Sequence, residues 1–130
     1  MYSYLYQNTD TNFCILHGLD GFDEISLTDE TKIISKNNEF ILKPSNFNLK
    51  KQELHQIKGG ETIEESAEIF YNVISGKGTN EQNNVVCANA GMAIATIENS
   101  AILEGFEKAK ESLLSGKALE KLKILQDLSK

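Results

Sequence analysis

Short apolar segments separated by polar turns fill the first half of the chain. Residues 1–6 alternate aromatic with other side chains, which fits either a strand or the end of a helix. The apolar run at residues 13–16 is typical of a strand covered on both faces, as in parallel sheets. Residues 31–35 and 39–42 flank a short polar connection that favours a hairpin, and Pro44 predicts the end of the pairing.

The second half of the chain has helical periodicity. Thr62 and Glu65 have the spacing of a capping box, and apolar residues then recur at helical spacing until Gly76. A second helix, from about residue 84 to 97, is apolar on nearly every side, so we expect it to be buried almost completely. Two further helices, separated by Ser115 and Gly116, each carry one apolar stripe: Ile102, Phe106, Ala109 and Leu113, then Leu119, Leu122, Leu125 and Leu128.

These elements predict an α/β fold that is incomplete. A strand of the parallel kind needs neighbours on both sides, yet only one such buried strand and one small antiparallel ribbon accompany about four helices. The wholly apolar helix also needs more packing partners than the chain visibly supplies. We therefore expect residues 1–130 to form a single partial α/β domain, the C-terminal portion of a larger sheet.

The charge and the basic residues of the chain limit the kinds of partner that it could bind. All 13 basic residues are lysines, no arginine occurs, and the formal net charge is −6. Nucleic-acid phosphates are held chiefly by clusters of lysine and arginine, so we expect no nucleic-acid binding. Without arginine, the chain also lacks the planar, two-pronged group that usually clamps carboxylates and phosphates.

The apolar runs, the cysteines and the histidines indicate where the protein is located and which metals it could bind. No apolar run approaches the ~20 residues that span a bilayer, and no signal-like leader opens the chain, so we expect a cytoplasmic protein without membrane contact. Cys14 and Cys87 lie in apolar patterns and are expected to be buried, reduced thiols. His17 and His55 have no companion at the spacing of zinc ligands.

The candidate chemistry lies in residues 17–28, where the apolar run ends in a loop that carries Asp20, Asp23 and Glu24. Open α/β sheets place their ligand sites at such strand ends. Adjacent carboxylates can share a cation, and Mg²⁺ typically takes one or two protein carboxylates together with phosphates and waters. A solvated acidic turn is the alternative. His17 could act as a general base, although a structural role at the strand end is favoured.

Two other features have structural interpretations. Gly59 and Gly60 precede a helix whose free amides could hold an anion, but the acidic residues of its first turn would repel a phosphate. The lysines of the last helix alternate with acidic residues, which is typical of a solvated outer face.

Four segments, in order along nearly the whole chain, resemble the C-terminal part of the anthranilate phosphoribosyltransferase family. They are residues 17–28 followed by Thr31 and Lys32, Gly59–Gly60 with the capped helix, Asn89–Ala90 in the small-residue helix, and residues 115–122. The resemblance implies the large α/β domain of a type III phosphoribosyltransferase, a fold shared with nucleoside phosphorylases. It also implies that Asp23 and Glu24 hold two Mg²⁺ ions against the pyrophosphate of phosphoribosyl pyrophosphate (PRPP), with Glu24 contacting both ions and Asp23 one.

By this resemblance, the full-length enzyme is a homodimer of tryptophan biosynthesis. It transfers phosphoribose from PRPP to the amine of anthranilate, giving N-(5-phosphoribosyl)anthranilate and pyrophosphate. The family's Gly-rich phosphate loop, its Lys-His-Gly-Asn stretch, its anthranilate-binding arginine and its N-terminal helical domain lie upstream of this segment. We therefore expect the chain alone to bind Mg²⁺ weakly, to hold no other catalytic or substrate-binding residue, and to be inactive.

The resemblance also aligns residues 1–6 with a helix. Two alternatives to the transferase stay open at this point. One is a domain related to the nucleoside phosphorylases, and the other is a non-catalytic module that a partner chain completes.

Overall fold

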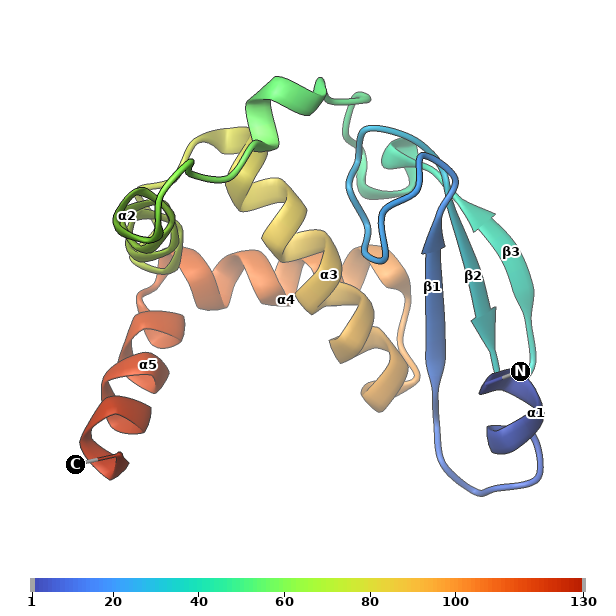
Figure 1. The fold of residues 1–130 in the computed structure, drawn as a ribbon. Helices are drawn as coiled ribbons and strands as arrows, with labels where there is room; N and C mark the ends of the chain where they lie inside the picture. The colour runs from blue at the N-terminus through green and yellow to red at the C-terminus, as the bar shows by residue number, and fades with distance from the viewer. Residues whose placement is uncertain (1, 130) are drawn as a thin grey trace.

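A small antiparallel sheet forms one side of the molecule. The computed structural model describes residues 2–129. Its three strands, β1 (Cys14–Gly18), β2 (Thr31–Ser35) and β3 (Glu39–Leu42), lie in the order β1-β2-β3 (Figure 1). Ile33 at the centre of β2 lies opposite Phe40 of β3, and the amide of Ser35 donates to the carbonyl of Asn38 across the turn, at 2.8 Å. The predicted hairpin is thus confirmed.

The strand predicted at residues 13–16 exists, but its expected parallel and fully buried character is wrong. β1 pairs only with β2, in antiparallel register, and its residues Cys14 to Leu16 are half-buried. The reason is that a short apolar run reports burial without reporting strand direction. Here the loop of residues 19–30 contains no helix and re-enters the sheet at the end where β1 stops, with Thr31 opposite Gly18, so β2 runs antiparallel to β1; a parallel neighbour would need a crossover back to the other end.

The N-terminal segment is helical, as the resemblance implied. α1 (Tyr2–Tyr6) is a short helix, and the Tyr6 ring packs on Phe13 just before β1, with centroids 5.6 Å apart. Met1 lies outside the described residues.

Five α-helices occur within residues 2–129, so the count of about four holds once α1 is set apart. Two 3₁₀ helices, η1 (Pro44–Phe47) and η2 (Leu54–Ile57), connect the sheet to the later α-helices. These α-helices are α2 (Ile63–Ile74), α3 (Asn80–Glu98), α4 (Ile102–Leu114) and α5 (Lys117–Leu128). α2 begins with the predicted capping box, because the Thr62 hydroxyl accepts from the Glu65 amide and the Glu65 side chain accepts from the Thr62 amide.

α3 differs from its prediction in two ways. It begins four residues earlier, at a capping box formed by Thr79 and Gln82 that the apolar pattern alone did not reveal. The expectation of almost complete burial is also wrong for this chain. Cys87, Ala88, Gly91, Met92 and Ala95 are buried on one face, but Val86 and Ile97 on another face are 41% and 77% exposed.

The core lies where α3 crosses α4 against the sheet. A Cβ placed on Gly105 of α4 would lie 2.2 Å from the carbonyl oxygen of Gly91 on α3. The two glycines therefore let the helix backbones approach closely. The rings of Phe47 and Phe106 then meet 5.2 Å apart inside the core, both 1% exposed.

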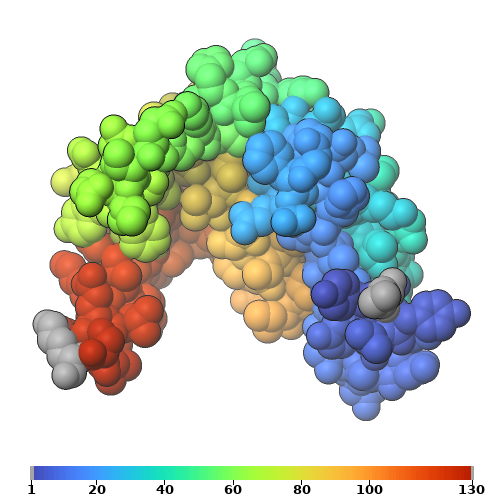
Figure 2. All heavy atoms as spheres, in the orientation of Figure 1, coloured from blue at the N-terminus to red at the C-terminus, as the bar shows by residue number. Residues whose placement is uncertain are grey.

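The molecule has the outline of an arch. The sheet and α1 form one limb, α2 and α5 form the other, and α3 and α4 run between them (Figure 1). Figure 2 shows a hollow between the α5 limb and the N-terminal limb, with α3 at its back. α5 buries none of its residues, and Leu125 and Leu128 are 63% and 81% exposed. In residues 2–129, no helix is both long enough and apolar enough to cross a bilayer.

Candidate functional site

The loop between β1 and β2 begins with a tight turn. The amide of Gly18 donates to the carbonyl of Phe22 at 2.8 Å, and the amide of Gly21 donates to the carbonyl of Gly18 at 3.1 Å. A Cβ on Gly18 would lie 2.7 Å from the Phe22 carbonyl oxygen, and Gly21 has φ +94°. Both glycines are required for this turn.

The next part of the loop is anchored in the core although it has no regular secondary structure. Ile25 and Leu27 are only 2% and 1% exposed. Leu27 has φ 61°, in the left-handed region, and its carbonyl accepts from the buried Gln52 amide at 2.9 Å. Such a conformation is costly for a branched side chain and recurs at functional sites, where surrounding contacts hold it.

A side chain of α3 binds the loop next to the acidic pair. The Oδ1 atom of Asn89 accepts from the Ile25 amide at 2.9 Å, and its Nδ2 atom donates to the Ile25 carbonyl at 2.9 Å. The same Nδ2 donates to the carbonyl of Val85 in α3 at 2.9 Å. The backbone that follows Glu24 is thus hydrogen-bonded directly to a side chain of the helix.

Asp20 ties the two ends of the loop together. Its Oδ2 atom accepts from the hydroxyls of Ser26, at 2.8 Å, and Thr28. Partial burial raises the pKa of the Asp20 carboxyl, but the bonds donated by Thr28, Ser26 and backbone amides outweigh it and hold the pKa below its usual value. Asp20 therefore has a supporting role in the loop, since its carboxylate holds Ser26 and Thr28.

The other acids of the loop fall into two kinds. Asp29 is paired with Lys51 at 3.3 Å, and Glu30 is paired with Lys43 at 3.0 Å. The carboxylates of Asp23 and Glu24 are exposed. Neither has a hydrogen bond or an ion pair to another residue of the described chain. The adjacent carboxylates of Asp23 and Glu24 are thus free, whereas Asp29 and Glu30 are paired with lysines and Asp20 accepts hydrogen bonds within the loop.

This arrangement fits a hard cation whose other ligands are water molecules and substrate phosphates. Within residues 2–129, no three His, Cys, Asp or Glu side chains gather as a metal-binding group, so the chain offers no complete cage. Mg²⁺ does not require one, since it keeps several waters and is held by one or two carboxylates together with substrate phosphates. Asp23 and Glu24 supply that number of carboxylates.

The remaining sequence candidates have structural roles or none. His17 is exposed on β1, opposite Lys32, and its imidazole makes no hydrogen bond to another described residue, so the expected capping of the strand by this side chain is wrong. Gly60 lies so close to α2 that a Cβ would be 2.5 Å from the Ser66 amide nitrogen. The Glu65 carboxylate accepts from the main-chain amides of Glu61 and Thr62, just before α2, which supports the structural interpretation of this segment. Lys117 pairs with Glu111 at 3.1 Å, as expected of a solvated surface.

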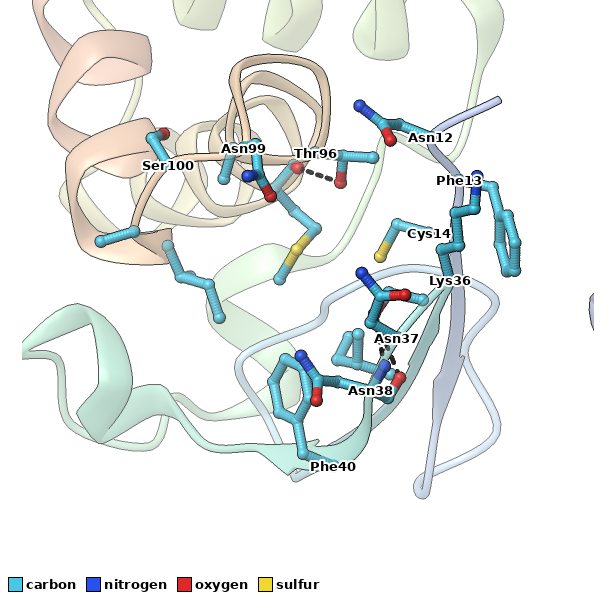
Figure 3. A pocket seen from close by; sticks show the side chains of 16 residues that line it. Asn12, Phe13, Cys14, Lys36, Asn37, Asn38, Phe40, Thr96, Asn99 and Ser100 are labelled. Carbon is cyan, nitrogen blue, oxygen red and sulfur yellow. Dashed lines mark hydrogen bonds between the residues drawn. The ribbon is translucent and has the colours of Figure 1, made fainter. Parts of the chain in front are cut away.

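Two open cavities lie at opposite ends of the sheet. One, of about 650 Å³, lies beside the acidic loop between Phe22 and residues 53–59. The other, of about 410 Å³, lies between the β2–β3 turn and the end of α3 (Figure 3). Cys14 lines it beside Thr96. Burial raises the pKa of the Cys14 thiol more than the hydrogen bond with Thr96 lowers it. Cys14 and Cys87 are both free thiols, as expected, and Cys87 is buried, but the expected burial is wrong for Cys14, which is half-buried at the edge of the cavity.

Comparison with known proteins identifies the protein family to which the chain belongs. A family model described as the glycosyl transferase family, a/b domain, matches residues 4–119, and the chain belongs to this family. Its relatives include anthranilate phosphoribosyltransferases. The chain is 63% identical over 129 residues to that of Flavobacterium psychrophilum, and 43% identical over 130 residues to that of Bacteroides fragilis. Each match covers 99% of this chain and 39% of the relative.

Solved structures agree with this assignment. The anthranilate phosphoribosyltransferase from Saccharomyces cerevisiae, in complex with PRPP and Mg, superposes with a TM-score of 0.77 at 30% identity, over 86% of this chain and 32% of that one. The enzyme from Thermus thermophilus gives a TM-score of 0.79 at 27% identity, over 87% and 34%. The chain is thus homologous to a segment of these enzymes, about two fifths as long as the curated relatives.

Sequence reasoning missed the residues that support the loop. Only the family resemblance includes Asn89, and no sequence pattern indicates the left-handed conformation of Leu27. The available signal was a lone carboxamide within the apolar part of a helix predicted to be buried, because a buried amide needs partners. Nothing in the sequence pattern indicated that those partners lie 64 residues away, at Ile25.

Proposed function

We propose that this chain supplies the Mg²⁺-binding carboxylates Asp23 and Glu24 of an anthranilate phosphoribosyltransferase of the type III fold. The full enzyme transfers phosphoribose from PRPP to anthranilate and releases pyrophosphate. The observation that carries the proposal is the free, adjacent pair on an anchored loop, in a chain 63% identical to a relative that bears this name.

The chemistry follows from charge. Bound Mg²⁺ neutralises negative charge that develops on the departing pyrophosphate. This chain could not do so with arginine, because it contains none. Asp23 and Glu24 would hold the cation, and in the proposal the complete site takes two ions. Asp20 and Asn89 fix the backbone on either side of the pair.

The remaining parts of the active site belong to the portion of the relatives that this chain does not span. In the proposal that portion contributes the phosphate-binding loop, the anthranilate-binding arginine and the helical domain. The full enzyme is a cytoplasmic homodimer. The chain alone binds Mg²⁺ weakly and does not turn over.

Metal binding is the first test. Mn²⁺ in place of Mg²⁺ allows free and bound ion to be distinguished by electron paramagnetic resonance, with and without pyrophosphate. We expect Asp23→Asn/Glu24→Gln to abolish the saturable binding of the unsubstituted chain. The matched control Asp29→Asn/Glu30→Gln removes the same charge from lysine-paired acids and leaves binding intact. Equal loss in both variants, or no binding by the unsubstituted chain, would refute the metal site.

Turnover is the second test. The purified chain is expected to form no phosphoribosylanthranilate from PRPP and anthranilate, whereas mixing it with a separately produced upstream portion of a close relative restores the product. Robust turnover by the chain alone contradicts the proposal that it is incomplete. Thermal stabilisation by a nucleoside, without a response to Mg²⁺ and pyrophosphate, points instead to a phosphorylase-related domain.

The exposed apolar surface of α3 and α5 favours a second candidate, a non-catalytic module completed by a partner chain. Sedimentation distinguishes this candidate, because a well-behaved monomer counts against a module that depends on a partner.

A further inference from the structure

We propose that Asn89 is a positioning residue for the metal-binding pair, acting through the backbone of Ile25. This inference rests on the proposed function of Asp23 and Glu24. Asn89 lies in the middle of α3, and its carboxamide makes hydrogen bonds of 2.9 Å to both the amide and the carbonyl of Ile25. It forms no hydrogen bond with the side chain of Asp23 or Glu24, so its effect on them is transmitted by the main chain.

The bond to the Ile25 amide fixes the orientation of Glu24. The nitrogen of Ile25 belongs to the planar peptide group that begins with the Glu24 carbonyl. When Asn89 holds that plane, the ψ angle of Glu24 is restricted, and so is the direction in which its side chain leaves the backbone. The bond to the Ile25 carbonyl fixes the following peptide plane in the same way. A cation site requires this kind of fixed geometry around its ligands.

An asparagine suits this position for a chemical reason. Ile25 is 2% exposed and lies outside any strand or helix, so its amide and carbonyl need partners that water cannot provide. A carboxamide offers one acceptor and two donors at a single group. Its Nδ2 atom also donates to the Val85 carbonyl, which fixes the rotamer on the helix. Alanine offers none of these groups, and aspartate would face two carbonyl oxygens with a negative charge.

The support behind Asn89 is rigid. Gly91, two residues further along α3, makes the close contact with α4, where a Cβ would lie 2.6 Å from the Phe106 backbone. Ala88, beside Asn89, is fully buried. The helix therefore carries the carboxamide on a backbone that packing holds in place, and the loop has a fixed reference at the point where its acids project.

The test compares Asn89→Ala with Thr96→Val in the same helix. Thr96 donates to the Met92 carbonyl at 2.8 Å, also contacts the Cys14 thiol, and has no hydrogen bond with residues 19–30, so it controls for loss of side-chain hydrogen bonds on this helix away from the acidic loop. Mn²⁺ affinity and melting temperature are measured for both. We expect Asn89→Ala to weaken Mn²⁺ binding by roughly 10- to 100-fold, while Thr96→Val binds like the unsubstituted chain at a similar loss of melting temperature.

The outcomes separate this inference from the proposed function. Binding by the unsubstituted chain with undiminished binding by Asn89→Ala overturns the positioning role and leaves the metal site standing. Equal weakening in Asn89→Ala and Thr96→Val shows a merely structural effect and also overturns it. Absence of binding in the unsubstituted chain refutes the metal site itself, and the positioning role with it.

A second measurement needs no variant and applies even if Asn89→Ala fails to fold. Coupling between two sites is reciprocal, so metal bound at Asp23 and Glu24 must strengthen the contact that positions them. Saturating Mg²⁺ is expected to slow hydrogen exchange at the Ile25 amide, whereas the Gln52 amide, bonded to Leu27, changes less. Exchange at Ile25 that does not respond to bound Mg²⁺ overturns the inference.

Discussion

The loop of residues 19–30 and the helix α5 show opposite relations between regularity and burial. The loop has no helix or strand, yet Ile25 and Leu27 are 2% and 1% exposed. α5 is a regular helix of 12 residues and buries none of them. Hydrogen bonds within a helix satisfy its backbone wherever it lies, whereas an irregular segment can be buried only if other groups satisfy its backbone.

The difference shows where the chain holds its geometry. Asn89, Asp20 and Gln52 provide the partners that the loop backbone and side chains require. α5 is held mainly at its N-terminal end, where Lys117 pairs with Glu111 and Ala118 packs against the core, while Leu125 and Leu128 of its apolar stripe are exposed. The region that carries the proposed chemistry is therefore fixed by long-range contacts, while the outer helix depends mainly on its own sequence.

A matched pair of leucine truncations makes the sharpest contrast. We expect Leu27→Ala to lower the free energy of unfolding by about 2 to 5 kcal/mol, the usual range for a buried leucine. Leu128→Ala, at a position 81% exposed, should change it by less than about 0.5 kcal/mol. Urea denaturation of the chain measures both. Equal losses would show that α5 is covered in solution, and the contrast between loop and helix would be wrong.

The crossing of α3 and α4 behind the loop gives the next largest effect. Gly105→Ala places a methyl group 2.2 Å from the Gly91 carbonyl oxygen, so we expect a loss of about 1 to 3 kcal/mol from forced separation of the helices. Gly59→Ala, ahead of α2, meets no atom within 4 Å and serves as the control. A neutral Gly105→Ala variant, judged by its thermal midpoint, would mean that the helix pair is more tolerant than its geometry indicates.

The smallest expected effect is the pH dependence contributed by Asp20. Its pKa is lower in the folded chain than in the unfolded one, so the folded state releases this proton more readily. The resulting stability is complete above the unfolded value of about 3.9 and is lost as the pH falls through the lower folded value. Denaturant midpoints at several pH values below about 5 should fall less steeply in Asp20→Asn. If the denaturant midpoints of Asp20→Asn fall with pH as steeply as those of the unsubstituted chain, Asp20 does not anchor the loop.

Much of the fold follows from local sequence signals. The capping box at Thr62, the hairpin around residues 36–38, the break at Gly116 and the two amphipathic stripes of α4 and α5 lie where the pattern predicts them. Each of these signals involves residues within a few positions of one another. Their geometry depends on the backbone and adjacent side chains, so no knowledge of the tertiary fold is required.

The wrong predictions for the direction of β1 and the burial of α3 have one common cause. The direction of β1 depends on which segment returns beside it, and the burial of α3 depends on which surfaces are present to cover it. Apolar residues at 13–16 or on α3 record a preference for burial without identifying the partner. The half-exposed Val86 shows that this preference is not fully met within the described residues.

The sequence by itself determined the helices, the hairpin and the adjacent carboxylates, because local periodicity, capping and residue chemistry are sufficient for them. Only the tertiary structure decided which acids are free. It places lysines on Asp29 and Glu30, and it turns Asp20 toward hydroxyl groups. It also brings Asn89 to Ile25 across 64 residues. Such pairings depend on how distant backbone segments pack against a shared core, and no local pattern encodes that distance.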